Sequence, residues 1–157
     1  MGSTHGNPSA SATIDAPLDA VWGVMLDLPS YEQWNPFAYR IDGDTSVGSP
    51  ILIHVRWANG KTVKSPERIA VVEPPTTGSD GVRRATLAYD YEGFPSKIGL
   101  LKGRRWQRLE QRDGGPTTYD TVEDFSGPLV RFAGPGRVAE GFARHAAALK
   151  QRAESLA

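Results

Sequence analysis

The chain has 157 residues, enough for one domain with a sizeable buried core, and its 18 Lys and Arg residues balance its 18 Asp and Glu residues. This balance argues against a nucleic-acid partner, which a strongly basic chain would favour, and fits a small neutral partner. The chain has no cysteine, which excludes disulfides, thiol catalysis and thiolate metal sites and fits a cytoplasmic location.

Residues 1–10 are small and polar, and they lack the basic start and apolar run of a secretion signal. We interpret them as a disordered tail before a single domain of residues 11–157. No apolar run reaches the roughly 18 residues that a membrane-spanning helix needs, and the N-terminus lacks a myristoylation pattern. The sequence therefore predicts no stable membrane anchor.

Two short helices are predicted after a first strand at 11–15. Pro17 fits the first turn of the first helix, and Pro29 is expected to end it. The apolar residues of this helix recur at helical spacing: Leu18, Val21, Trp22, Met25 and Leu28. Ser30 can then cap a single-turn helix that runs through Trp34.

The segment from residue 37 to residue 126 alternates β-branched and aromatic runs with turn residues. The runs predict strands at 37–43, 50–57, 62–73, 82–92, 104–112 and 117–126. Most connections have hairpin length, so neighbouring strands should pair antiparallel. The connection at 93–103 is longer and unusually apolar, and it either packs on the sheet edge or forms a lid over a pocket.

A long amphipathic helix closes the chain. Gly127-Pro128 is expected to start it, and Gly134-Pro135-Gly136 to kink or restart it. Its apolar stripe follows steps of three or four residues: Val138, Phe142, His145, Leu149, Ala153 and Leu156. One face of this helix must be buried, and the predicted sheet is available to bury it.

This order of elements resembles the helix-grip superfamily (SRPBCC, START-like and birch-pollen-allergen-like), and within it the bacterial polyketide cyclase/dehydrase type. The resemblance covers residues 11–156 and rests on four segments: Ala16-Pro17 with Val21-Trp22, Tyr31 to Phe37, Glu123 to Gly127, and Phe142 to Glu154. It implies an α+β fold, in which a curved antiparallel sheet of about seven strands wraps around the long C-terminal helix.

The resemblance also implies a function. A hydrophobic, polyketide- or lipid-like molecule would bind between helix and sheet without a cofactor, and the protein would either help it to cyclise or dehydrate or carry it unchanged. A third alternative is a protein-interaction module like the chaperone-activating relatives of this fold.

Alternation along the strand at 117–126 puts Thr121, Glu123 and Phe125 on one face, which the resemblance places inward. A carboxylate that faces an apolar cavity has its pKa raised by desolvation. Glu123 is therefore the leading candidate for a proton-transfer group. The alternative is a structural carboxylate bonded to an arginine of the neighbouring strand.

Periodicity does not decide which residues of the strand at 104–112 face inward. One alternation is Arg104, Trp106 and Arg108, and the other is Arg105, Gln107 and Leu109. The resemblance favours the second, and Trp106 remains a candidate for the pocket wall. Leu87, Tyr89 and Tyr91 alternate in the same way, so Tyr89 is either a carbonyl-orienting phenol or part of an aromatic core.

The three histidines, His5, His54 and His145, are too scattered for a metal site; His54 should point to solvent, and His145 is either a core residue or a pocket residue. Glu123 and Tyr89 are the candidate catalytic residues. The candidate ligand-binding residues are Trp34, Phe37, Leu87, Tyr91, Arg105, Trp106, Gln107, Thr121, Phe125, Phe142 and His145.

Overall fold

A computed structural model of the chain, which describes residues 7–157, contains one antiparallel sheet in the order β1-β7-β6-β5-β4-β3-β2. The strands are β1 (Ser9–Ile14), β2 (Ala38–Gly43), β3 (Pro50–Arg56), β4 (Thr62–Thr77), β5 (Arg83–Tyr91), β6 (Lys102–Gln111) and β7 (Thr117–Ser126). The helices are α1 (Leu18–Leu26), α2 (Phe94–Lys97) and α3 (Pro135–Leu156), with 3-10 turns η1 (Leu28–Gln33) and η2 (Val130–Phe132).

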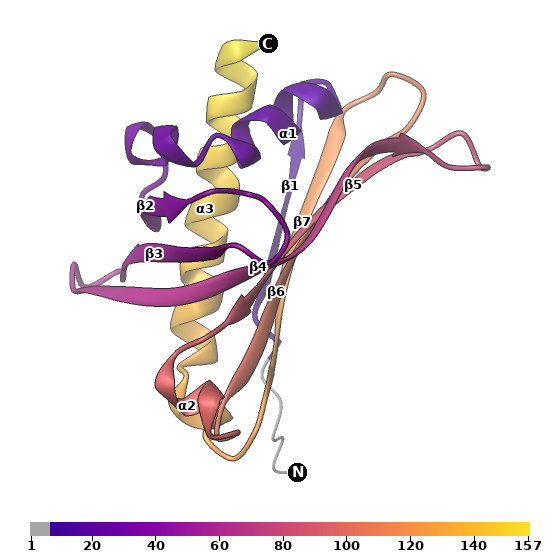
Figure 1. Cartoon of the computed structure of the whole chain (residues 1–157). Coiled ribbons are helices and arrows are strands. Elements are labelled where there is room, and N and C mark those ends of the chain that lie inside the picture. Colours follow the sequence, from indigo (N-terminus) through magenta and orange to yellow (C-terminus); the bar gives the residue numbers. More distant parts are fainter. Residues whose placement is uncertain (1–6) are drawn as a thin grey trace.

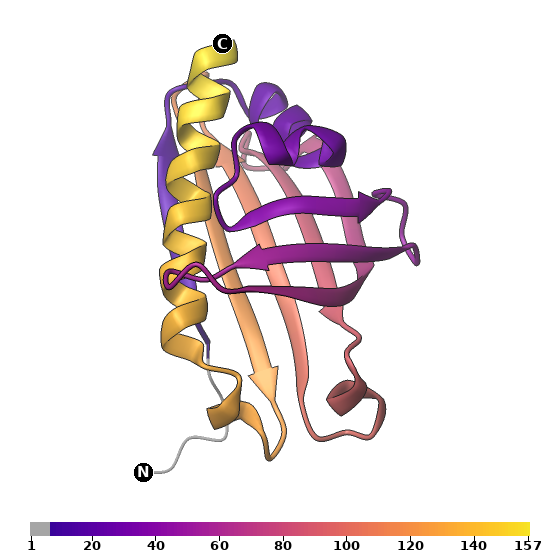
Figure 2. The ribbon, with the colours of Figure 1, turned by 90° about the vertical axis from the view of Figure 1, so that its left-hand side faces the viewer.

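The sheet curls around α3, as Figures 1 and 2 show from two sides. In Figure 2, β2 and β3 run roughly horizontally, whereas β6 and β7 run roughly vertically, parallel to α3. The long strand β4 connects the two directions, and its register with β5 shifts between Ile69 and Val71 and again between Glu73 and Thr76. Such irregularities bend a strand and increase its twist. The helix-grip fold predicted from the sequence is confirmed.

Helix α3 buries the predicted stripe from Val138 to Ala153, but Leu156 at its end is 61% exposed. The helix begins at Pro135, within the segment predicted to kink or restart it, so the predicted start at Gly127-Pro128 is wrong. Gly134 has a φ of +67° in the left-handed region, which a continuous helix cannot contain.

Strand β1 begins at Ser9, so residues 9 and 10 do not belong to the predicted tail. Ser9 pairs with Val122 of β7, and the carbonyl of Pro8 accepts a hydrogen bond from the Glu123 amide at 3.0 Å. These residues are small and polar, and they join the sheet through backbone bonds that leave no apolar pattern in the sequence. Residues 1–6 of the predicted tail lie outside the described part of the chain.

The first helices also differ in detail from the expectation. Helix α1 ends at Leu26, and Pro29 lies in the first turn of η1 instead of ending α1. Tyr31 of η1 is fully buried, and its hydroxyl donates to the carbonyl of Met25 at 2.7 Å. This bond fixes η1 against α1, and together they close the end of the molecule where α3 terminates (Figure 1).

The connection at 93–103 contains the single turn α2, and only Leu101 of its large apolar side chains packs against the core. Phe94 is 71% exposed and Ile98 54% exposed. Figure 1 shows α2 at the end of the molecule opposite to the C-terminus. Within residues 7–157, no helix has the combination of length and apolarity that crossing a membrane would require.

Candidate functional site

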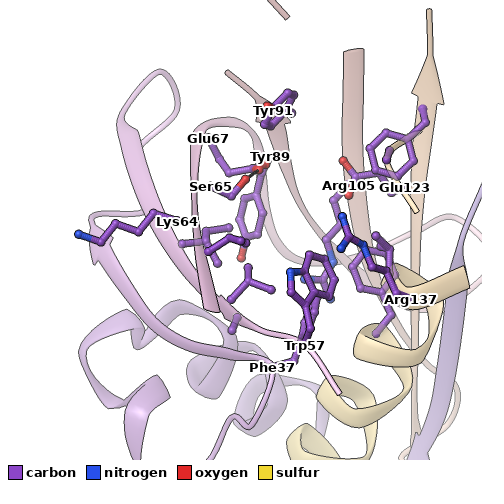
Figure 3. Close-up of a pocket in the computed structure, with 18 of the residues that line it drawn as sticks. Phe37, Trp57, Lys64, Ser65, Glu67, Tyr89, Tyr91, Arg105, Glu123 and Arg137 are labelled. Atoms are coloured by element: carbon purple, nitrogen blue, oxygen red, sulfur yellow. Dashed lines mark hydrogen bonds between the residues drawn. The ribbon is translucent and has the colours of Figure 1, made fainter. Parts of the chain in front are cut away.

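A cavity of about 350 Å³ lies between the inner face of the sheet and the first turns of α3. This volume falls in the range of roughly 300–1,000 Å³ typical of small-molecule sites. Figure 3 shows side chains from the strands and from α3 around it. Seven of the predicted site residues line the cavity: Phe37, Tyr89, Tyr91, Arg105, Glu123, Phe125 and Phe142.

Alternating burial along β6 decides the question that periodicity left open. Arg105, Gln107 and Leu109 are buried on the inner face, whereas Trp106 lies between them on the outer face. There the Trp106 ring packs against the guanidinium of Arg108, whose central carbon is 4.5 Å from the ring centroid. Trp106 therefore does not form a wall of the cavity, in contrast to the prediction, because neighbouring residues of a strand point to opposite faces.

Five further predicted residues do not line the cavity. Leu87, Gln107, Thr121 and His145 are buried elsewhere between the sheet and the helices, and Trp34 borders separate surface hollows beside η1 and α3. The sequence pattern identifies inward-facing positions, but it does not show how far along the strand the open space extends. Packing of the neighbouring side chains determines that.

Glu123 of β7 is only 8% exposed and borders the cavity. Burial raises its pKa to about 7, although the positive charge of Arg105 opposes the shift. Arg105 lies opposite Glu123 in the register of β6 and β7, but its guanidinium donates to Thr121 Oγ1 at 2.9 Å and to the Tyr119 hydroxyl at 3.3 Å. Among the described residues Glu123 forms no ion pair, in contrast to the structural role considered as the alternative.

Gly103 makes room for this carboxyl group. A Cβ atom at position 103 would lie 2.6 Å from Glu123 Oε2 and 3.0 Å from the ring of Phe125. No side chain larger than hydrogen fits there unless one of these groups moves. The glycine therefore keeps the inner face of β6 open beside the Glu123 carboxyl.

A second buried carboxyl, which the sequence analysis missed, comes from β4. Glu67 lines the cavity, and burial and the nearby charge of Glu123 raise its pKa to about 8. The Ser65 hydroxyl donates to Glu67 Oε2 at 2.5 Å, and Figure 3 shows Glu67 and Ser65 together across the cavity from Glu123. A sequence signal existed, because Glu67 precedes the apolar Ile69 by two residues and so shares its face.

A chain of hydrogen bonds orients the polar groups next to the cavity. Arg105 can only donate to the Tyr119 hydroxyl, so that hydroxyl donates onward to Gln107 Oε1 at 2.7 Å. This leaves Gln107 Nε2 as a buried donor without a partner in the described part of the chain, and the Tyr89 hydroxyl is unpartnered there too. The ring of Tyr89 lines the cavity, but its hydroxyl oxygen is itself buried.

Asn35 determines which ring nitrogen of His145 carries the proton. Its Oδ1 accepts from the backbone amides of Phe37 and Ala38 at 2.9 and 3.0 Å, so its Nδ2 donates to His145 Nδ1 at 2.9 Å. Burial holds the pKa of His145 well below its ordinary value, so the ring is neutral and carries its proton on Nε2. His145 thus joins α3 to the segment after η1 and does not line the cavity.

His54 points to the outer side of the sheet, as predicted, but its bond with Asp42 keeps its side chain partly covered. It lies on the outer face of β3, where Nε2 bonds Asp42 Oδ2 at 2.8 Å and the side chain is only 12% exposed. Within residues 7–157, no three His, Asp or Glu side chains gather closely enough to hold a metal ion. The ionisable groups around the cavity can accept, donate or move protons.

The family model for polyketide cyclases, dehydrases and lipid-transport proteins matches residues 7–154. None of the curated protein sequences matches the chain. Among solved structures, a hypothetical protein of Helicobacter pylori superimposes with a TM-score of 0.69 and 13% identity, over 94% of this chain and 87% of that one.

Two further solved structures are similar in fold. A point mutant of Thalictrum flavum norcoclaurine synthase, in complex with a transition-state analogue, has a TM-score of 0.65 and 12% identity over 99% and 98% of the two chains. The di-domain ARO/CYC BexL has a TM-score of 0.64 and 11% identity over 97% of this chain and 50% of its own length. At these identities the likeness concerns the fold alone.

Proposed function

Since the chain belongs to the polyketide cyclase/dehydrase and lipid-transport family, whose members typically bind hydrophobic ligands, we propose that its cavity binds a polyketide- or lipid-like molecule. The observation that supports this most is a cavity of about 350 Å³ with mainly apolar walls and two buried carboxyl groups. Apolar walls favour a hydrophobic guest, and a few polar groups can orient it.

The two carboxyl groups suit proton transfer at neutral pH. The pKa of Glu123 is raised to about 7 and that of Glu67 to about 8, so near neutrality Glu123 is partly ionised while Glu67 is largely protonated. Glu123 would act as the base and Glu67 as an acid on the opposite wall. Environments that separate the pKa values of two acids in this way are typical of acid–base pairs.

The proposed reaction closes a ring in a chain that carries several carbonyl groups. Ionised Glu123 removes a proton from the carbon between two carbonyls, and the positive charge of Arg105, which lines the cavity, stabilises the enolate oxygen. The enolate carbon bonds to another carbonyl carbon of the same molecule, the double bond of that carbonyl becomes a single bond, and the alkoxide that forms takes the proton of Glu67. Enclosure by the apolar walls favours the folded chain.

The substitution Glu123→Gln tests this role, because it keeps the shape of the side chain but removes its basicity. We expect it to abolish turnover of a substrate recovered from the host and to leave binding of that substrate intact. Mass spectrometry of the small molecule after incubation with each protein measures both effects. Undiminished turnover by the variant would contradict the role of Glu123, and a molecule recovered unchanged from the wild type would assign the protein to carriers.

A further inference from the structure

Two neighbouring segments, residues 93–102 and 127–137, form one end of the molecule, which we call the basic apolar end. The Leu129 amide donates to the carbonyl of Leu100 at 3.0 Å, and Figures 1 and 2 both show α2 and the start of α3 at the same end of the molecule. Seven large apolar side chains are exposed among the described residues, and four belong to this end: Phe94 (71%), Phe132 (65%), Ile98 (54%) and Leu100 (36%). So much exposed apolar surface in one place indicates a binding surface.

The charges of this end all have one sign. Neither segment contains Asp or Glu, and their basic residues are Lys97, Lys102, Arg131 and Arg137. None of the four forms an ion pair within residues 7–157, and residues 1–6 contain no acidic side chain. The acidic residue next to the first segment, Glu92, is neutralised by Arg68 at 2.9 Å. This end therefore has an excess of positive charge, although the whole chain has a formal net charge of zero.

The basic apolar end also borders the cavity. Leu101, Phe132, Ala133 and Arg137 belong to its two segments and line the cavity wall. The guanidinium of Arg137 lies over the ring of Trp57, another lining residue, at 4.4 Å from the centroid. A hydrophobic guest that passes between these residues would never need to cross bulk water if the end lay on a lipid surface.

We propose that the basic apolar end docks reversibly on an anionic lipid bilayer. Phe94, Ile98 and Phe132 enter the boundary between headgroups and acyl chains, and the four cations lie among the lipid phosphates. The part of the cavity wall that Leu101, Phe132, Ala133 and Arg137 form then faces the bilayer. This inference goes beyond the proposed ligand binding, because it assigns the surface from which the guest is taken or to which it is delivered.

Charge and shape favour a lipid surface over a second copy of the chain. Two copies that met through this end would bring their eight cations together, which is unfavourable. Phe94 and Phe132 stand on two separate turns, α2 and η2, each of which also carries a cation, Lys97 or Arg131. A fluid bilayer accommodates such protrusions without a complementary groove. Anionic headgroups supply the opposite charge.

Vesicle flotation tests the proposal. The probes are vesicles of phosphatidylglycerol and phosphatidylcholine in equal parts and vesicles of phosphatidylcholine alone. We expect the wild type to bind the anionic vesicles, more weakly as salt rises, and to bind the neutral ones poorly. Phe94→Ser with Ile98→Ser should weaken binding by about tenfold or more, and Lys97→Gln with Arg131→Gln by about tenfold. None of these four residues lines the cavity.

Matched controls remove two exposed apolar side chains or two positive charges elsewhere on the surface. Val47→Ser with Leu156→Ser, at positions that are 64% and 61% exposed, and Arg40→Gln with Arg112→Gln should bind as the wild type does. Absence of wild-type binding to anionic vesicles would overturn the proposal, as would equal losses in the controls. A wild-type dimer that Phe94→Ser with Ile98→Ser converts to monomers, measured by light scattering, would reassign the surface to a subunit interface. Guest binding in solution should persist in all these variants, which separates this proposal from the proposed function.

Discussion

Glu67 and Glu123 reach the cavity from β4 and β7, which β5 and β6 separate in the sheet. Each carboxyl is buried, and neither has an arginine or lysine ion pair among the described residues. Both therefore hold protons at a pH where ordinary carboxyl groups are ionised. The folded protein keeps these two acids in a state that the unfolded chain would not.

This retention of protons makes stability fall as the pH rises. Above pH 4.5 the unfolded chain has released protons that the folded protein keeps up to about pH 7 and pH 8, so alkalinity favours unfolding. The lowered pKa of His145 acts in the opposite direction, but only below about its ordinary value of 6.5. Between neutral pH and about pH 8, the free energy of unfolding should fall by about 1 to 2 kcal/mol.

Urea denaturation at several pH values measures this slope. Glu67→Gln should flatten it, because glutamine has no proton to release. Glu73→Gln is the matched control, since Glu73 lies exposed on the same strand, and it should leave the slope unchanged. A wild-type stability that rises between neutral pH and pH 8 would contradict the burial of both acids.

At the scale of single residues, the sequence supports some site assignments better than others. Resemblance places Glu123 inward, and the structure has it there, on the same buried face as Phe125. The strand at 104–112 carries arginine on both faces, so alternation alone does not show which face is inner. The structure buries Arg105, on the face that the resemblance favours, and not Trp106. Glu67 was missed because Pro66 and polar neighbours hide the short alternation that ends in Ile69.

At the scale of elements, close contact between α3 and the segment before β2 depends on Gly141. The ring of Phe37 lies so close to this glycine that a Cβ atom there would be 2.1 Å from Phe37 Cε1. The same ring meets Phe142 edge-on, with centroids 5.9 Å apart. Phe37 therefore anchors the chain to α3 where the cavity begins.

Gly141→Ala should destabilise the protein by about 2 kcal/mol, because displacement of the Phe37 ring outweighs the gain of about 1 kcal/mol in helix propensity. Gly136→Ala is the control in the same helix. A Cβ atom at Gly136 meets nothing within 4 Å, so this variant should be as stable as the wild type or slightly more so. Denaturant midpoints compare the two, and a stabilised Gly141→Ala protein would contradict the packing described.

Element types and their order could be predicted, because strand alternation and the helical stripe are strong signals over many residues. Element ends could not. The start of α3 depends on the left-handed Gly134, and β1 extends to Ser9 through backbone bonds that small residues do not reveal. Likewise, the apolar residues of 93–103 suggest packing, whereas the structure exposes Phe94 and Ile98.

At the scale of the whole molecule, the sheet bends at β4 far enough to surround α3, and side chains at one end leave space between them. The order of elements predicts that the sheet curls around the last helix. The cavity volume, however, depends on how the side chains of many distant residues fill the interior, and no local sequence pattern predicts that packing. The volume of the cavity and the grouping of residues in the basic apolar end are therefore seen only in the folded structure.

The presence of a guest in this cavity is the central claim, and native mass spectrometry of the protein purified from its own host tests it most directly. Ser65→Phe places a ring in the cavity, and Ser79→Phe makes the same change in an exposed turn. We expect the wild type and Ser79→Phe to carry the added mass of one small molecule and Ser65→Phe to carry none. A wild type at its bare mass, or a Ser65→Phe protein that retains the same added mass, would contradict the claim.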